Sequence, residues 1–321
     1  MTDRYARQTV LPEVGAAGQA RLAAARVLVV GAGGLGSPVL ATLAGAGVGQ
    51  LNVLDHDRVE ESNLHRQPLY RMTDLGRSKA EAAREALLAA NPAISVDAMP
   101  RRLAVAEAPD LIAAADLVLD CADSLAVTYV LSDACRADSK PLVSASVLGL
   151  SGYVGAFCGG APSYRAVFPD MPSTVGSCAA NGVLGSVVAV LGGLQAHMAL
   201  QILLRLDPSP LGRLVSVDLR TLTFGGFAFG DAAEPVGAEI PFLGRDAVAS
   251  ADLVVDLRGA DEAPEPVTPD ALRLTQNRLD ELPLDRRILL CCASGVRAHR
   301  AARSLAARGA RDLAVLALSL G

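Results

Sequence analysis

The chain has 321 residues, enough for one large domain or for two of unequal size, and 51% of its residues are hydrophobic and 20% charged. A formal net charge of -5 offers no clustered positive surface for the phosphates of DNA or RNA, and the opening MTDRYARQT lacks the apolar run of a secretory signal. These features argue against a nucleic-acid-binding or secreted class, and we expect a cytoplasmic protein.

Apolar strand patterns alternate with alanine-rich helical patterns along the first half of the chain. This alternation predicts an α/β fold with a mostly parallel sheet. In chain order we predict a strand at 27–30, a helix at 34–46, a strand at 50–54, a helix at 78–90, and strands at 94–98, 116–120 and 141–147. The helix that reaches residue 90 should end there, because the proline at position 92 cannot continue it.

The pattern changes after Gly152 to short strands separated by glycine and proline turns. An apolar stretch then runs from Val183 to Leu204, but Gln195 and His197 interrupt it. It is therefore unconvincing as the roughly 20-residue apolar segment that a bilayer requires. We predict a helix in the core or at a subunit interface and no membrane contact. The sequence RLVSVDLRTLTFGGFAFG, residues 213–230, resembles a β-hairpin.

A change in composition divides the chain into two domains. The segment GDAAEPVGAEIPFLG, residues 230–244, is rich in glycine, proline and acidic residues, which is typical of a linker. A new strand and helix alternation begins at ADLVVDLRG and ends at RRILLCCASGVRAHRAARSLAARG. We therefore predict a large domain at 1–230, a linker at 231–245 and a second, smaller α/β domain at 246–321.

A glycine-rich turn joins the first predicted strand to the first predicted helix. Gly31, Gly33 and Gly36 follow the spacing G-x-G-x-x-G, Gly34 lies within the same turn, and Asp55 closes the next strand. Glycines permit a tight turn, amides at the start of the helix face a phosphate, and an acid at this position binds a ribose. The order of these features predicts a mononucleotide or dinucleotide site. A packing turn without a ligand is the alternative.

The sequence that follows, DHDRVEESNLHRQ, favours a triphosphate over NAD. It adds Asp57, Asn63, Arg66 and Gln67, and Lys79 follows on the next predicted helix. Two cations and an amide suit a triphosphate whose charge grows during the reaction. Hydride transfer would instead need a general acid against the carbonyl of the substrate, and no histidine is obviously placed for it. Taken singly, the two cations would be ordinary solvated charges.

Together these motifs resemble the ThiF/MoeB/HesA family, the bacterial relatives of the ubiquitin-activating enzymes. The resemblance rests on RYARQ, GAGGLG, LDHDRVEESNLHRQ, GRSKAEAA and LVLDCAD, and it covers the predicted large domain. It implies a Rossmann-like, mostly parallel sheet and the use of ATP and magnesium. It also implies the reaction: adenylation of the C-terminal glycine carboxylate of a small ubiquitin-like sulfur carrier that ends in Gly-Gly.

The resemblance assigns roles to the residues that match the family's motifs. Asp55 would bind the ribose, and Asp123 would coordinate magnesium. Arg7 would reach into the site of the neighbouring subunit of a homodimer. Ser124 stands where the family usually has an asparagine. The cofactor-binding set is Gly31, Gly33, Gly34, Gly36, Asp55, Asp57, Asn63, Arg66, Gln67 and Lys79, and the catalytic candidates in this domain are Arg7, Arg66, Lys79, Asp123 and Cys178.

The six cysteines form no C-x-x-C pair. Family members often carry a zinc ion on two such pairs, but Ser163 and Ala166 occupy the positions of the first pair, and no pair lies near EPVG. We therefore expect zinc to be absent. Cys178 precedes the apolar helix, where the family often has a cysteine on a crossover loop, and a helix N-terminus favours a thiolate. A small buried residue is the alternative for this cysteine.

The second domain contains the sequence CASGVR between an apolar strand and an Ala/Arg-rich helix. A cysteine at such a turn faces backbone amides and the positive end of a helix, which stabilise a thiolate or a persulfide. With VVDLRG upstream, this resembles a rhodanese domain. The resemblance implies that Cys292 carries sulfur in a persulfide loop formed by Cys292, Ser294, Gly295 and Arg297, whereas Cys291 is a buried strand residue. Many such loops have a basic residue where Ala293 stands, which favours a cysteine desulfurase over thiosulfate as the sulfur donor.

These features predict adenylation of the sulfur carrier, followed by sulfur transfer from a Cys292 persulfide to give a thiocarboxylate. One alternative is an adenylating enzyme that acts on another carboxylate and has an inactive second domain. Two further alternatives are a nicotinamide oxidoreductase, suggested by the glycine turn alone, and a non-catalytic scaffold that binds a carrier. The sequence does not identify the pathway in which the carrier would act.

Overall fold

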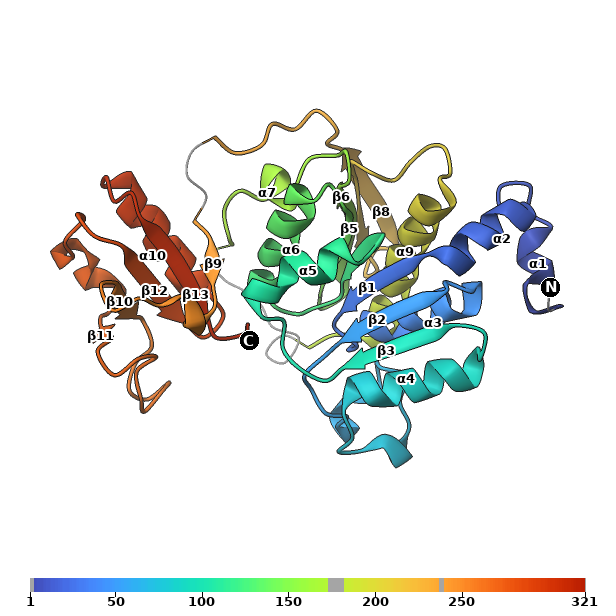
Figure 1. Ribbon diagram of the computed structural model, residues 1–321, viewed down its shortest axis with the longest axis horizontal. Coiled ribbons are helices and arrows are strands. Elements are labelled where there is room, and N and C mark those ends of the chain that lie inside the picture. Colours follow the sequence, from blue (N-terminus) through green and yellow to red (C-terminus); the bar gives the residue numbers. More distant parts are fainter. Residues whose placement is uncertain (1–2, 173–181, 237–239, 321) are drawn as a thin grey trace.

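Two separate sheets form the scaffold of the molecule, and the computed structural model describes residues 3–172, 182–236 and 240–320 (Figure 1). The large sheet has the order β3-β2-β1-β4-β5-β6-β7-β8. Its parallel part consists of β1 (Arg26–Val30), β2 (Gln50–Leu54), β3 (Ser95–Met99), β4 (Leu117–Asp120) and β5 (Pro141–Leu148). The antiparallel part consists of β6 (Ser151–Cys158), β7 (Arg213–Asp218) and β8 (Thr223–Ala228). The predicted α/β class with a mostly parallel sheet is confirmed.

The central strands are mostly apolar because helices cover both faces of the sheet. Val27, Leu28 and Val29 of β1 are all fully buried. One face is covered by α2 (Gly15–Ala24), α3 (Gly36–Ala46), α4 (Lys79–Ala90) and α9 (Gly185–Leu204), and the other by α5 (Ala108–Ala113) and α6 (Leu125–Ala137). The remaining short helices are α1 (Ala6–Thr9) and α7 (Tyr164–Val167), and 3-10 turns lie at Asp3–Tyr5, Glu61–Asn63, Met72–Asp74, Val105–Glu107, Arg245–Ala247 and Gln276–Glu281.

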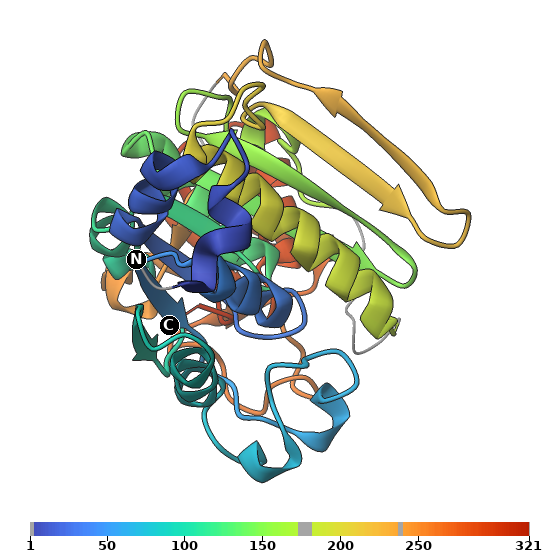
Figure 2. The same ribbon diagram turned by 90° about the vertical axis from the view of Figure 1, so that its right-hand side faces the viewer.

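The apolar helix α9 is long and apolar enough to cross a membrane by length and composition alone. It lies instead along one face of the large sheet, packed on β4, β5 and β6, and its length is seen in Figure 2. The amide of Gln195 is fully buried and donates to the carbonyls of Asp120 and Val143. These bonds tie the middle of α9 to β4 and β5, which is the arrangement predicted for a core helix.

The small sheet is entirely parallel, with the order β11-β10-β12-β13-β9. Its strands are β9 (Phe242–Leu243), β10 (Leu253–Asp256), β11 (Leu272–Arg273), β12 (Ile288–Cys292) and β13 (Leu313–Ala317), and α10 (Val296–Ala307) packs on β12 and β13. Strand β9 lies inside the segment predicted as a linker. It is ordered there because Phe242 is buried against ring systems of both domains, His299 and Tyr129.

Candidate active site

A cavity of about 700 Å³ lies at the carboxyl ends of β1, β2 and β4. The strand order reverses between β1 and β4, and in doubly wound sheets the crevice outside the carboxyl ends of the strands at such a point binds the ligand. Residues of four regions predicted from the sequence line the cavity together: Gly31, Gly33, Gly34, Asp55, Asp57, Asn63, Arg66, Gln67, Lys79 and Asp123. Of the predicted cofactor-binding set, Gly36 alone does not line it.

The four glycines of the turn have different surroundings. A Cβ atom on Gly31 would lie 2.6 Å from the carbonyl oxygen of Cys121, and one on Gly36 would lie 2.1 Å from the carbonyl oxygen of Gly31. These two glycines are required by backbone packing. A Cβ atom on Gly33 would meet nothing closer than the amide of Gln67 at 3.7 Å. Gly33 therefore leaves open space that belongs to the cavity.

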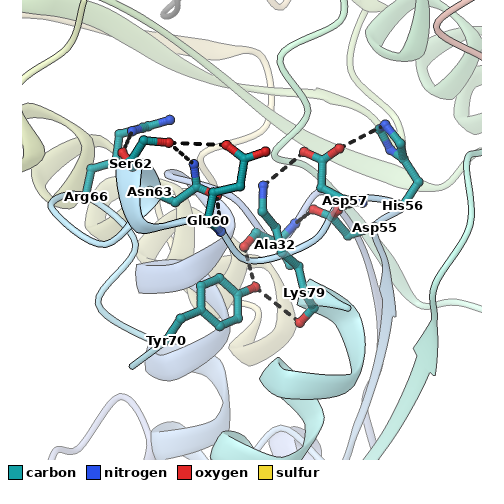
Figure 3. A network of polar contacts seen from close by, with 10 residues as sticks. All are labelled: Ala32, Asp55, His56, Asp57, Glu60, Ser62, Asn63, Arg66, Tyr70 and Lys79. Carbon is teal, nitrogen blue, oxygen red and sulfur yellow. Dashed lines mark hydrogen bonds and ion pairs between the residues drawn. The ribbon is translucent and has the colours of Figure 1, made fainter. Parts of the chain in front are cut away.

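Asp55 is buried at the end of β2, and the backbone holds both of its carboxylate oxygens. Oδ2 accepts from the amide of Ala32 at 2.7 Å and Oδ1 from the amide of Asp57 at 2.7 Å (Figure 3). Tyr70 holds the glycine turn in place, because its hydroxyl donates to the carbonyl of Ala32 at 2.6 Å. The carboxylate predicted to bind the ribose is therefore rigidly oriented at the wall of the cavity.

Lys79 brings its ammonium group to the cavity from the first turn of α4. Its side chain is almost fully buried, and Nζ donates to Oδ2 of Asp57 at 2.9 Å (Figure 3). Burial raises the pKa of Asp57, but the hydrogen bond and charge of Lys79, with the charges of His56 and Arg102, outweigh it and hold that pKa below its usual value. The carboxylate of Asp57 therefore stays ionised, and its ion pair holds the Lys79 side chain at the wall of the cavity.

The 3-10 turn after β2 supplies Asn63, Arg66 and Gln67. Asn63 is buried, and its Oδ1 accepts from the amide of Glu60, which closes the turn. Arg66 donates from Nη1 to the carbonyl of Ser62 at 2.9 Å, so its guanidinium lies over the turn (Figure 3). Oε1 of Gln67 is buried and has no hydrogen-bond partner among the residues that the structure describes. A buried acceptor without a donor is costly, so this atom is suited to a ligand that donates.

Asp123 and Ser124 follow β4 on the opposite side of the cavity. Asp123 is exposed. Behind it, Asp120 is fully buried and accepts from Thr128 and Ser144, and burial raises the pKa of Asp120 to about 6. Side-chain atoms of Asp55, His56 and Asp57 lie close enough together to hold a cation, whereas Asp123 is not part of that group.

Sequence reasoning missed several residues that line the same cavity. Arg102 follows β3, and an aromatic wall is formed by Tyr129, Tyr153, Tyr164 and Phe168. The hydroxyls of Tyr153 and Tyr164 lie 2.6 Å apart. Arg102 could have been predicted from the sequence, because residues that follow parallel strands gather at one edge of a sheet. The aromatic wall could not have been predicted in this way, because it combines residues of α6, β6 and α7, which are separate elements.

Two predicted catalytic residues are not brought to the cavity by the described structure. Arg7 is exposed on α1 and does not line the cavity, and its role in a neighbouring subunit stays a prediction. Cys178 lies outside the described residues.

A carboxylate joins the two segments for which the family resemblance implied zinc-binding cysteine pairs. The backbone amide and the hydroxyl of Ser163 donate to the two oxygens of Glu234 at 2.7 and 2.6 Å. Arg136 lies 3.5 Å from the same carboxylate. This contact, which we call the Ser163–Glu234 clasp, links the start of α7 to the segment after β8.

The predicted persulfide loop lies between β12 and α10. Cys292 is fully buried, and its Sγ accepts from the amide of Ala298 in the first turn of α10 at 3.4 Å. Gly295 has a φ of 83°, which permits the sharp entry into the helix. Arg297 donates to the carbonyl of Leu257 at 3.3 Å and pairs with Glu262. Ser294 is exposed at the tip of the loop.

Cys291 lies on the other face of the small sheet, buried in a cluster with Val254, Leu289 and Ala314. Burial first, and then the charge of Asp256, raise the pKa of Cys291 to about 12. This thiol is therefore neutral at ordinary pH, as expected for a buried strand residue.

The fold and the cavity define a doubly wound α/β protein with a polar site at the switch point of the sheet. The sequence matches the ThiF family over residues 5–235. The chain belongs to this family, which confirms the resemblance inferred from its motifs.

Two relatives and one solved structure illustrate the match. The chain is 36% identical over 349 residues to the probable adenylyltransferase/sulfurtransferase MoeZ of Mycobacterium tuberculosis, covering 96% of this chain and 89% of that protein. It is 48% identical over 218 residues to mouse adenylyltransferase and sulfurtransferase MOCS3, covering 67% of this chain but only 47% of that protein, about half its length. The crystal structure of E. coli MccB with ATP has a TM-score of 0.63 at 22% identity, covering 71% of this chain and 72% of that one, and supports the fold.

Proposed function

We propose that this protein uses ATP and magnesium to adenylate the C-terminal glycine carboxylate of a small ubiquitin-like sulfur carrier ending in Gly-Gly. The observation that carries the proposal is the cavity at the switch point, where Lys79, Arg66 and Asp123 surround the open glycine turn. Family membership and the name of MoeZ, whose match covers almost the whole chain, support it.

The residues of the cavity fit a nucleotide with a divalent cation. Gly33 leaves the space that a phosphate would fill, and Lys79 is held beside it by Asp57. The unpartnered oxygen of Gln67 would accept from a donor on the ligand. Asp123 would hold magnesium, which prefers carboxylate oxygens and keeps several waters. Magnesium would supply Lewis-acid stabilisation of the phosphate charge.

The chemical need for this arrangement follows from the substrate. A carboxylate is a poor electrophile because it is anionic and lacks a good leaving group. Its attack on the innermost phosphorus joins it to AMP and releases pyrophosphate. Lys79 and Arg66 would stabilise the charge that develops on the departing pyrophosphate. The peptide tail would reach this phosphorus along the aromatic wall, of which Tyr153 is part.

The second step would use the small domain. A cysteine desulfurase would load Cys292 as a persulfide, whose terminal sulfur attacks the acyl adenylate and displaces AMP. A second thiol, for which Cys178 is the candidate, would then attack Sγ of Cys292 and release the thiocarboxylate, so that the carrier keeps the terminal sulfur. This leaves a disulfide between Cys178 and Cys292, which a dithiol reductant would reduce before the next cycle. The amide of Ala298, which donates to Sγ of Cys292, supports the stabilisation of a sulfur anion there.

The assembly and location are part of the same proposal. We propose a homodimer in which Arg7 enters the cavity of the neighbouring subunit, because Arg7 is exposed on α1 and free to do so. We also propose that the protein acts in the cytoplasm.

The test is ATP–pyrophosphate exchange that depends on a Gly-Gly carrier, followed by mass spectrometry of the carrier for replacement of oxygen by sulfur. Lys79→Met should reduce the exchange rate by about 100-fold or more, because it removes a charge that stabilises the transition state. Arg84→Met is the matched control, since Arg84 is an exposed cation on the same helix. Absence of exchange in the unaltered protein with any such carrier would refute the proposal.

Cys292 is fully buried, and a buried thiol favours an inactive small domain. The second candidate function is therefore adenylation of another carboxylate without sulfur transfer. If Cys292→Ser still supports the complete reaction, this second candidate is correct. Loss of thiocarboxylate with retention of exchange would support sulfur transfer.

A further inference from the structure

The small domain contributes directly to the rim of the nucleotide cavity. Ser319, which follows β13, is the residue of the small domain that lines it among those described. Its hydroxyl accepts from the hydroxyl of Ser124 at 2.9 Å, and its carbonyl accepts from Nη1 of Arg102 at 3.2 Å. Ser124 and Arg102 also line the cavity, so the docking contact and the cavity share two side chains.

The side chain of Arg102 lines the cavity and also contacts the small domain at Ser319. It is exposed at the end of β3, close enough to Asp57 for its charge to act on that carboxylate. Within the described part of the chain its guanidinium makes no ion pair, and its hydrogen bond goes to the neutral carbonyl of Ser319. A charged acceptor makes a bond about twice as strong as a neutral one, so a phosphate in the cavity would compete for this guanidinium.

Cys292 is buried in a hydrophobic core to which both sheets contribute. The loop that follows it lies against the large domain, since a Cβ atom on Gly295 would lie 3.5 Å from Ala126 of α6. The same Cβ atom would lie 2.9 Å from the ring of Phe242 in β9 of the small sheet. On α10, His299 lies 6.1 Å from the ring of Tyr129 by centroids.

An ion pair closes the outer edge of this interface. Arg303 of α10 lies 3.0 Å from Asp170 of the large domain, and both side chains are exposed. The hydrophobic core that buries Cys292 is continuous across the two domains. Figure 1 shows the small domain resting on the side of the large domain that carries α5, α6 and α7.

We propose that Arg102 is a positioning residue that couples the two sites: nucleotide phosphates draw its guanidinium away from Ser319, docking of the small domain weakens, and Cys292 becomes reactive once the cavity is loaded. This inference rests on the proposed function, because it requires a nucleotide in the cavity. The coupling has a chemical benefit. A persulfide would stay shielded until an acyl adenylate is present to receive its sulfur.

The experiment measures the alkylation rate of Cys292 by iodoacetamide, quantified on its own peptide by mass spectrometry, in the full chain. A non-hydrolysable ATP analogue with magnesium should accelerate it about fivefold in the unaltered protein, the effect of losing one hydrogen bond from the docked state. In Arg102→Ala the rate should be about fivefold higher without nucleotide and should not respond to the analogue. Arg102→Lys keeps a cation and should restore part of the response.

Ser319→Ala is the matched control, because it removes the hydroxyl contact with Ser124 and keeps the carbonyl that Arg102 binds. It should raise the basal rate and leave the response to the analogue in place. Calorimetry reports nucleotide binding independently. Binding without any change in the alkylation of Cys292, or an equal response in Arg102→Ala, would overturn the coupling alone. Absence of nucleotide binding would overturn the proposed function as well.

Discussion

At the scale of single residues, the glycine turn between β1 and α3 combines two separate requirements. Gly31 and Gly36 lie where a side chain would collide with backbone, and Gly31 also has a φ of 98°. Gly33 has neither constraint and borders the cavity. One sequence motif therefore contains two glycines that backbone packing requires and a third, Gly33, that we propose is needed only for the ligand.

This difference predicts opposite outcomes for two alanine substitutions. Gly36→Ala should lower the free energy of unfolding by about 1–3 kcal/mol or more, because the new Cβ overlaps the carbonyl of Gly31. Gly33→Ala should change it by no more than about 0.5 kcal/mol. It should nevertheless weaken nucleotide binding about tenfold, by filling the space of a phosphate. Urea unfolding and calorimetry measure the two effects. Equal destabilisation by both substitutions would contradict this assignment.

At the scale of elements, the Ser163–Glu234 clasp connects segments 71 residues apart in the sequence. The carboxylate of Glu234 is only partly exposed and accepts from both polar groups of Ser163, with Arg136 nearby. Charged acceptors with two donors are among the stronger hydrogen-bonding arrangements in proteins. The clasp lies where the family resemblance implied zinc-binding cysteine pairs, and we expect it to join these two segments without a metal.

Removing the clasp should therefore destabilise the large domain. Glu234→Ala should lower the free energy of unfolding by about 1–3 kcal/mol, because Ser163 loses its charged partner. Asp231→Ala, in an exposed acid of the same segment, is the control and should have little effect. A zinc chelator should leave the melting temperature of the unaltered protein unchanged. A large drop with the chelator would show that a metal, and not the clasp, holds this region.

At the scale of the whole molecule, His299 lies in the interface between the domains. It stacks on Phe242 at 6.1 Å between centroids. Burial, followed by the positive charges of Arg165 and Arg303, lowers the pKa of His299 from 6.5 to about 4, while Asp170 opposes the shift. The histidine is therefore neutral in the docked molecule at physiological pH.

The direction of the pH effect follows from this lowered pKa. Between about pH 6.5 and pH 4 the unfolded chain binds a proton at His299 that the folded molecule does not, so the free energy of unfolding falls as the pH is lowered through this range. The contribution is at most about 3 kcal/mol. His299→Phe should flatten the dependence measured by urea unfolding at several pH values, and His197→Gln, in an exposed histidine of α9, should not. An unchanged slope in His299→Phe would refute the assignment.

Local patterns predicted most of the fold and the polar half of the site. Strand β2 was predicted at its observed bounds, and α4 within one residue, because buried strands and capped helices depend on short-range periodicity. The turn residues and Lys79 also come from segments with strong motifs. Strand β9 was missed because two residues carry no periodicity. Its strand is fixed by pairing with β13 and by the burial of Phe242.

The sequence by itself determined the family, the glycine turn and the cations that follow it, because these lie within short stretches whose chemistry is local. Only the tertiary structure brought Arg102 and Ser319 together, at positions 217 residues apart, and placed the buried Cys292 in a core to which both sheets contribute. Contacts of this kind depend on how separately folded units meet. No pattern along the chain predicts how the two units dock, because docking depends on complementary surfaces that form only after each unit has folded.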